Sequence, residues 1–419
     1  MTVNNRLRKL ARDEEGFSLV FVAMGFLAFL SVSMLAIDTG MLMTARNQAQ
    51  NSADASALAG VTALVFDDWN DRSTSGPAVQ NALTAARQNQ VMGGTVTITP
   101  ADVVFLNDAT GTSDRVQSTV YRDNSHNNAL PTLIAQYFGI KTVDVAATAT
   151  AEATSANYAT CTLPFTIPDR WIENSDGTGT PDGPWSPSST FDLWYSKGSN
   201  QNGGVALPNP DVYVPGPASQ GGTGYGLGDK GLLIVLKSNN QNKVSPSIYN
   251  PWDINGTTGA NAYSSNISQC NPSQQLPNGS FLLPETGNMT GPTSQGVNAL
   301  IAEDPAADWN DTLKCPVEGG NSNNAGPCLG PSNGVVPIPP GTTPRIGTIP
   351  LYDPTVYAQG QQSGKSQPQL QVVGYLGFFI EQVTGAGDVT GRICPILGGY
   401  NANLGPGTGS FAKAIRLVK

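Results

Sequence analysis

The side chains that could do acid–base chemistry are few, and their setting argues against catalysis. His126 is the single histidine of the chain, so any serine–histidine–aspartate arrangement would depend on it as the general base. It lies in RDNSHNNA (122–129), a polar stretch typical of a solvated loop. We therefore expect no catalytic residue and no enzyme activity. A hydrolase with an unrecognised site is the remaining enzymatic alternative.

Two kinds of turn could hold a ligand, and each lacks the spacing that such a site needs. The glycine-rich run GTGYGLG (222–228) follows PGPASQG rather than a strand, which is typical of a flexible turn and not of a phosphate loop. The acidic turns at 174–177 and 308–311 carry the oxygen atoms that calcium prefers, but neither has the spacing of an EF-hand loop. We expect no cofactor and no metal site, and the sequence does not identify a small-molecule ligand.

The cysteines favour structural disulfides over catalysis or metal binding. The chain has five of them, Cys161, Cys270, Cys315, Cys328 and Cys394. None lies in a CxxC pair, and the single histidine argues against a zinc site. An odd number leaves at least one thiol free or joined to another chain. Because Cys315 and Cys328 flank a short Gly/Asn-rich loop, we predict that these two form a disulfide, although the sequence alone leaves the connectivity open.

An apolar run near the amino terminus decides where all these residues can act. The segment FSLVFVAMGFLAFLSVSMLAI (17–37) contains no charged, proline or amide residue. At a helical rise of about 1.5 Å per residue it can cross a bilayer core of roughly 30 Å. Four basic residues precede it and Asp38 follows it, so the positive-inside rule places residues 1–16 in the cytoplasm and the chain after Asp38 outside.

Two alternatives for this segment fit less well. The apolar core of a cleaved signal peptide is shorter and is followed by a cleavage site, whereas here an amphipathic helical pattern follows. A core helix of a soluble protein would have a polar face, and residues 17–37 have none. We therefore predict a retained transmembrane helix.

The helical pattern continues beyond the predicted membrane span as a stem. Residues 41–64 are rich in Ala, Gln, Leu and Met, which have high helix propensity. Small side chains recur at spacings of three and four and so share one face. We expect this face to pack closely on another helix or a sheet, the alternative being that alanine is simply a good helix former. The face consists of Ala49, Ala53, Ser56, Ala57, Gly60 and Ala63.

These motifs, in this order, are similar to those of a known family. Glu15–Phe17 (EGF), the apolar span, Ile37–Gly40 (IDTG) and Gln50–Gly60 (QNSADASALAG) follow one another. The order resembles the amino-terminal region of the TadE/TadG-like proteins of Flp pilus (tight adherence) assembly, strongly over roughly the first seventy residues and moderately to about residue 155. The resemblance implies a structural or accessory component of pilus assembly in the inner membrane. Its implied partners are membrane lipid and other pilus-assembly or pilin-like subunits.

The chain departs from related patterns at two places. Gly16 and Phe17 resemble a type IV prepilin processing site, but major pilins usually have a glutamate at the fifth mature position, where this chain has Phe21. An accessory role is therefore implied more than that of a main filament subunit. Some TadG members carry a von Willebrand A domain with a metal motif. The nearest string here, DASAL (54–58), lacks its second serine, so we expect no such metal site.

The composition favours an exported body rich in turns and strands. Glycine and proline number 47 and 31, or 78 of 419 residues, which exceeds their usual sum of about 12%. The net charge is −9 and charged residues make up 13% of the chain. No Lys/Arg-rich patch occurs outside the amino terminus, which argues against nucleic-acid binding.

The sequence predicts an α+β protein in which an N-terminal transmembrane helix continues into a long stem helix. A small α+β pilin-like head and an irregular β-rich C-terminal domain follow. We expect five segments: a cytoplasmic basic segment at 1–16, the transmembrane helix at 17–37, the stem helix at 38–66, the head at 67–158, and an extracytoplasmic Gly/Asn/Pro-rich domain at 159–419.

Local patterns predict the elements within these segments. Strands are expected at 95–100, 102–106, 115–123, 143–154, 231–237, 345–353, 371–383 and 391–397. Short helices are expected at 132–139, ended by Gly139, and at 294–304, with Ser294 as its N-cap.

Aromatic residues in the polar loops keep a second function open. Such side chains can stack on sugars or anchor protein contacts, although they more often fill small cores beneath long loops. The alternative function is thus a membrane-tethered surface-adhesion or glycan-binding module. The residues are Trp171, Trp185, Trp194, Tyr195, Tyr225, Trp252 and Trp309.

Overall fold

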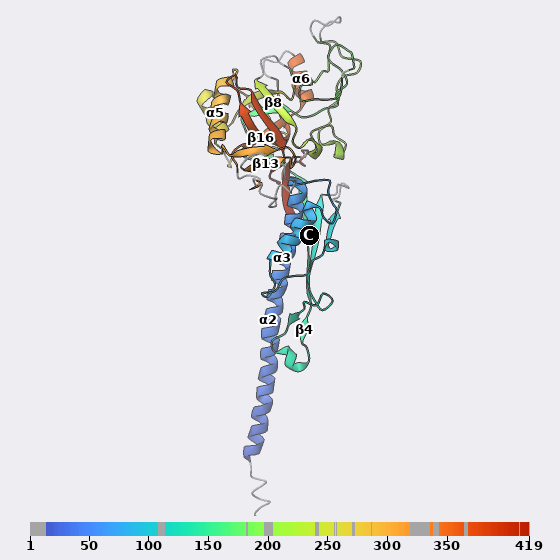
Figure 1. Ribbon diagram of the computed structural model, residues 1–419, viewed down its shortest axis with the longest axis vertical. Coiled ribbons are helices and arrows are strands. Elements are labelled where there is room, and N and C mark those ends of the chain that lie inside the picture. The colour runs from blue at the N-terminus through green and yellow to red at the C-terminus, as the bar shows by residue number, and fades with distance from the viewer. Residues whose placement is uncertain are drawn as a thin grey trace, which may run out of the picture.

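The protein consists of one long helix with most of the chain folded around its C-terminal end (Figure 1). The structure is a computed structural model. It describes residues 14–107, 114–181, 183–196, 204–238, 243–254, 256, 258–269, 273–285, 287–318, 336–337, 343–363, 368–409 and 411–418.

The long helix α2 (Glu14–Phe66) contains 53 residues, which corresponds to a length of about 80 Å. It is long and apolar enough to cross a membrane, and its apolar 18-residue window is not buried at all. Large apolar side chains from Leu19 to Met43 are exposed along it. These properties suggest that α2 anchors the protein in a membrane.

The C-terminal half of α2 is covered by a helix and a sheet. Helix α3 (Pro77–Gln88) lies beside it (Figure 1), and an antiparallel sheet packs on it mainly through β5 (Val145–Ser155) and β2 (Arg115–Arg122). Strand β5 has the sequence VAATATAEATS. Because its inward side chains are as small as those of α2, the helix and the sheet can approach closely.

The last strand of the chain completes this head sheet. The strand order is β1 (Val103–Leu106), β2, β5, β19 (Ala412–Val418) and β18 (Ile396–Leu397). Strand β19 pairs antiparallel with β5 over six residues. Both β18 and β19 lie in the segment predicted as the β-rich domain, 159–419, so two strands of the head sheet come from outside the predicted head segment.

A carboxylate from β5 ties three strands of the head sheet together. Glu152 is 3% exposed and accepts hydrogen bonds from Arg115 Nε on β2 and Arg416 Nε on β19, each at 2.8 Å. Both guanidinium groups also form ion pairs with it. Charge-assisted bonds of this kind are shorter and stronger than neutral ones, and here they fix β19 in its register.

Residues 165–394 form a closed β-barrel of six strands, with β11 (Phe281–Pro284) bridging β16 and β9. The sheet closes because β16 pairs with β17 as well as with β15. Apolar side chains such as Phe165, Leu376 and Phe378 fill the interior. The ring order is β16 (Leu370–Val383), β15 (Ile346–Tyr352), β7 (Phe165–Pro168), β9 (Ile248–Asp253), β8 (Leu233–Ser238) and β17 (Val389–Cys394).

Short elements decorate the barrel. Helices α4 (Ala260–Ser268) and α5 (Thr290–Glu303) pack on each other, and α5 also packs on β16. Asp353 caps helix α6 (Pro354–Gln362) by accepting bonds from two backbone N–H groups. The small sheets contain β12 (Ala307–Asn310), β13 (Cys315–Glu318) and β14 (Val336–Pro337), β10 (Leu276–Pro277) and β6 (Tyr158–Ala159), and β3 (Leu130–Pro131) and β4 (Thr142–Val143). Single 3-10 turns are η1 (Pro100–Asp102), η2 (Ala135–Phe138), η3 (Ala218–Gln220) and η4 (Leu227–Asp229).

The β-rich character of the C-terminal region and the long N-terminal helix agree with the sequence prediction, but three local predictions are wrong. Residues 95–100 form a single bridge, Thr97 to Tyr121, instead of a strand. The Asn128 side chain occupies the next pairing position, because its Nδ2 donates to the Thr95 carbonyl at 3.5 Å and its Oδ1 accepts from the Asp123 backbone N–H at 3.0 Å.

The other two errors concern helices. The predicted helix at 132–139 is only the 3-10 turn η2, because the Thr132 backbone N–H donates to the Lys141 carbonyl at 3.1 Å and Gly139, at φ 94°, ends the turn. Helix α5 begins at Thr290, with Met289 in the N-cap position, so Ser294 is not the cap. Pro292 is tolerated there because it lies in the first turn.

Candidate functional site: the faces of the long helix

The predicted processing site lies at the start of α2. Gly16 and Phe17 are within its first turn, and Phe21, at the position of the pilin glutamate, is 56% exposed. The apolar side chains that follow are exposed as well. This N-terminal part of the helix therefore offers an apolar surface to lipid or to another apolar helix.

The stripe of small residues lies in the C-terminal half of α2, against its own chain. The side chains of Ala49, Ala53 and Ala57 are at most 1% exposed and belong to the core shared by α2, α3 and the head sheet. Ser56, Gly60 and Ala63 are buried too. The contacts of this face in the structure are therefore intramolecular.

Two serines of this helix bond directly to α3. Ser52 Oγ donates to the Ala86 carbonyl at 3.0 Å, and Ser56 Oγ donates to the Ala82 carbonyl at 2.9 Å. Both side chains are fully buried, so these bonds satisfy hydroxyl groups that would otherwise be costly to bury. Ser56 thus joins two helices, although it belongs to the string that resembles a metal motif.

Gly60 marks the closest approach between α2 and its neighbours. A Cβ atom at this position would lie 2.9 Å from Val116 Cγ1 and 3.3 Å from both the Ala78 carbonyl oxygen and the Ala82 Cβ. Real Cβ atoms essentially never come closer than 3.0 Å to another heavy atom. A side chain at position 60 would therefore force α2 away from β2 and α3.

Asp38 ties a loop of the head to the middle of α2. Its carboxylate accepts hydrogen bonds from the backbone N–H groups of Leu133 at 2.9 Å, Ile134 at 3.2 Å and Ala135 at 2.6 Å. Desolvation opposes the charged form of Asp38, but these three N–H groups outweigh it and lower its pKa below the ordinary value. Asp38 thus marks the end of the apolar span in the sequence and also holds a loop of the head against α2.

The C-terminal end of α2 is bound by the barrel. Lys230 Nζ donates to the carbonyl oxygens of Phe66 and Asp67, the latter at 2.9 Å. A cation at a helix C-terminus interacts favourably with the helix dipole. Burial nevertheless lowers the pKa of Lys230 to about 8. Sequence reasoning missed this contact because it joins residues that are more than 160 positions apart.

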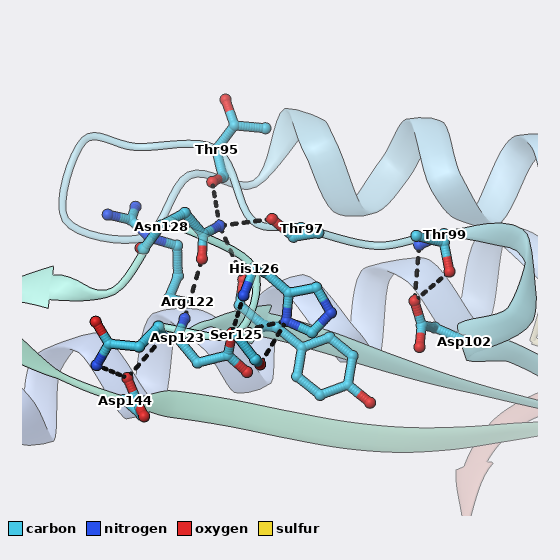
Figure 2. Close-up of polar contacts among 12 residues, drawn as sticks. Thr95, Thr97, Thr99, Asp102, Arg122, Asp123, Ser125, His126, Asn128 and Asp144 are labelled. Atoms are coloured by element: carbon cyan, nitrogen blue, oxygen red, sulfur yellow. Dashed lines mark hydrogen bonds and ion pairs between the residues drawn. The ribbon is translucent and has the colours of Figure 1, made fainter.

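His126 does not form a catalytic triad. Figure 2 shows its side chain beside Asp123 and Ser125. Nδ1 lies 2.6 Å from Asp123 Oδ1 and 3.3 Å from Ser125 Oγ. In a serine–histidine–aspartate relay, the acid and the nucleophile face opposite nitrogens of the ring, whereas here both face the same one.

The Asp123 carboxylate organises the turn that contains His126. It also accepts bonds from the His126 backbone N–H and the Ser125 hydroxyl, both at 2.9 Å. Desolvation alone would raise the pKa of Asp123. The hydrogen bonds outweigh it, so the pKa lies below its ordinary value. The His126 ring stacks on Tyr121 at a centroid distance of 4.6 Å. The group is a hydrogen-bonded turn between β2 and β3.

The cysteines have structural environments. Cys161 and Cys315 are disulfide-bonded, whereas Cys394 is free and buried. Burial raises the pKa of the Cys394 thiol to about 12, despite the nearby Lys230, so it is a poor nucleophile. Cys270 and Cys328 lie outside the described residues, and the Cys315–Cys328 pairing stays a prediction.

The loop aromatics mostly fill cores. Trp171 and Trp252 are 1% and 3% exposed. Trp171 makes edge contacts with Trp185 at 6.2 Å and with Phe191 at 5.3 Å. Tyr225 and Trp309 are buried as well, and Trp185, Trp194 and Tyr195 are half-buried. The described aromatics therefore do not form an exposed platform for stacking a sugar.

The junction between head and barrel contains a cleft of about 510 Å³. Trp69 and Lys413 line it from the head side, and Arg170 and Asp229 from the barrel. Both cations of the cleft already have a partner within the protein. Arg170 pairs with Asp229, and Lys413 Nζ lies 5.5 Å from the centre of the Trp69 ring. Among the described residues, no three His, Cys, Asp or Glu side chains are grouped so that they could hold a metal ion.

Comparison with known proteins identifies only the helix. No curated protein matches the chain, and no solved structure matches it. Residues 16–63 match the family described as "Putative Flp pilus-assembly TadE/G-like". The match covers the exposed apolar half of α2, Asp38 and all of the buried small-residue face. The resemblance predicted from the N-terminal motifs is thus confirmed, and α2 is similar to the helix of TadE/G-like Flp pilus-assembly proteins.

Proposed function

We propose that the protein is a membrane-anchored, extracytoplasmic accessory component of Flp (Tad-type) pilus assembly that acts through protein–protein contacts. The observation that carries this proposal is the family match at residues 16–63. It falls on a helix whose N-terminal half is exposed and apolar and whose C-terminal half is buried by the head. One half is suited to a membrane, and the other carries a large folded body.

The charge pattern supports an orientation. Arg6, Arg8, Lys9 and Arg12 precede the apolar span and Asp38 follows it, so the amino terminus stays in the cytoplasm and the body is exported. From Asp38 to Phe66, α2 rises by about 43 Å. The barrel would then stand well above the inner membrane, where it can reach other subunits.

An exported body also suits the cysteines. Disulfides persist in extracytoplasmic compartments, and Cys161 and Cys315 are disulfide-bonded. We keep the Cys315–Cys328 pair as the expected connectivity for the second of these residues.

Phe21 supports an accessory role rather than that of a main filament subunit. In pilins, the glutamate at this position is thought to meet the amino terminus of a neighbouring subunit, and a phenylalanine cannot make that charged contact. The loop aromatics are mostly buried, so no observation favours the alternative of a glycan-binding module.

Fractionation of cells that assemble Flp pili tests the proposal. We expect the tagged full chain in membranes and only traces of it in sheared filaments, together with co-purification of pilus-assembly subunits. A periplasm-specific reporter fused after Lys419 should be active, and a cytoplasm-specific reporter at the same point should be silent. A major band in sheared filaments would contradict the accessory role, and the reverse reporter pattern would contradict the topology.

A further inference from the structure

Strands β3 and β4 and the loop between them, residues 130–143 and here called the 130–143 loop, have an unusual surface. Leu133 and Phe138 are each 54% exposed, Ile140 is 53% exposed and Tyr137 is 83% exposed. The small polar Thr132 is instead buried, and its hydroxyl donates to the Ile140 carbonyl at 2.6 Å. The loop therefore has a defined conformation that turns apolar side chains outward, the reverse of an ordinary solvent-exposed loop.

Asp38 fixes the height of this loop along α2. Its carboxylate holds three successive backbone N–H groups, those of residues 133–135. Asp38 directly follows Ile37, the last residue of the apolar span. In Figure 1 the segment around β4 lies beside α2, closer to the start of the helix than α3 does. The exposed apolar side chains are thus level with the end of the span and continue its apolar surface.

We infer that the 130–143 loop is a second contact with the bilayer, seated in the headgroup region of the leaflet where the α2 span ends. Tyrosine together with apolar side chains is typical of a membrane–water interface. The adjacent exposed Lys141 suits lipid phosphates. The inference rests on the membrane anchoring in the proposed function, and it adds that the body stands on the membrane at two points.

A photo-crosslinking experiment on the full chain in intact membranes tests the inference. Benzoylphenylalanine replaces Phe138, or Phe281 on β11 of the barrel as a control, since Phe281 is also 54% exposed. The same replacement at Phe29, within the span, reports on anchoring itself. We expect phospholipid adducts by mass spectrometry at positions 29 and 138 and none at 281.

The outcomes separate the two claims. Lipid adducts at 29 without any at 138, or adducts at 138 to another protein, would overturn the loop inference and leave the anchor intact. An absence of lipid adducts at 29 would overturn both. Equal yields of lipid adducts at 138 and 281 would show unspecific labelling and also overturn the loop inference.

Two variants of Asp38 test whether it holds the 130–143 loop in place. Asp38→Ala removes the acceptor, so we expect the lipid adducts at 138 to be lost while those at 29 persist. Asp38→Asn keeps one acceptor oxygen and should retain part of the yield at 138. An unchanged yield at 138 in the alanine variant would show that Asp38 does not position the loop against the bilayer.

Discussion

Glu152 and Asp169 are two nearly fully buried carboxylates that have different neighbours. Glu152 faces two guanidinium groups, whereas Asp169 accepts bonds from the backbone N–H groups of Arg170 and Tyr225 and from the Tyr213 hydroxyl. The Arg170 side chain pairs with Asp229 instead. Desolvation is therefore not offset by a cation, and the pKa of Asp169 rises to about 6.

The raised pKa of Asp169 predicts a pH dependence of stability. Because the folded state binds this proton more tightly than the unfolded state, the contribution is full below pH ~4 and is lost as the pH rises through ~6. The loss is on the order of 3 kcal/mol at about 1.4 kcal/mol per unit of pKa. Asp169→Asn should remove this dependence.

Chemical denaturation of the solubilised full chain between pH 4 and 7 measures this pH dependence of stability. We expect the variant to gain stability relative to the parent protein as the pH rises through this range. A difference between the two proteins that does not change with pH would contradict the assignment.

At the scale of residues, sequence reasoning recognised the setting of His126 but could not find Asp169 or Lys230. Seven of the eight residues of RDNSHNNA are polar, so local composition is enough to predict a loop. The donors around Asp169 come from positions up to 56 residues away, and the acceptors of Lys230 lie more than 160 residues away. Their burial depends on the barrel closing, which no local pattern reports.

Among the elements, the small-residue face of α2 can be tested by substituting two glycines of this helix. Gly60→Leu places side-chain atoms where a Cβ alone would already lie 2.9 Å from Val116 Cγ1. We expect a loss of roughly 1–3 kcal/mol of stability, since overpacking at a close contact costs about this much.

Gly40→Leu is the matched control for this change. Gly40 lies in the same helix, and a Cβ there would meet nothing within 4 Å. Leucine has the higher helix propensity at both positions. Thermal unfolding of the two variants in detergent compares them, and equal transition temperatures would show that the face tolerates bulk.

A second test at this scale concerns how β19 is held. Glu152→Gln keeps the shape of the side chain but removes the charge that both arginines bind. Because the arginine side chains are 31% and 46% exposed, water compensates in part, and we expect a loss of roughly 1–2 kcal/mol.

Hydrogen exchange is the selective readout for this variant. Amides of 412–418 should exchange faster in Glu152→Gln than in the parent protein. The control Glu381→Gln, which affects a pair within the barrel, should leave these amides unchanged. Equal protection of β19 in the Glu152 variant would show that the ion pairs do not hold the strand.

The elements that the sequence predicted well are those with strong local signals. The long N-terminal helix follows from an apolar run and an alanine-rich continuation, and β16 follows from QVVGYLGFFIEQV. Helix α3 and strand β19 were missed. PAVQNALTAARQ is short with modest apolar content, and AKAIRLV becomes a strand through its pairing with β5 and β18. Ladder partners so distant in sequence leave no local trace.

At the scale of the whole molecule, the arrangement is a rod with a body at one end (Figure 1). The sequence predicted a long apolar N-terminal helix and a β-rich C-terminal region, and the structure has both. The sequence could not indicate that six strands close into a barrel, because closure depends on β16 pairing on both of its edges. The relation of the barrel to the helix likewise depends on single contacts such as that of Lys230.

The return of the chain to the head sheet has a consequence for how the protein is organised as modules. The Ala156 backbone N–H bonds to the Ala412 carbonyl at 2.9 Å, and Ser155 is the register partner of Lys413. The chain thus leaves the head and re-enters it at neighbouring points of two antiparallel strands. In topological terms the barrel is an insertion into the turn of a hairpin. A tight turn joining β5 directly to β19 would excise it while keeping the anchor, the stem and four of the five head strands, so the barrel is the part of this protein that can be exchanged.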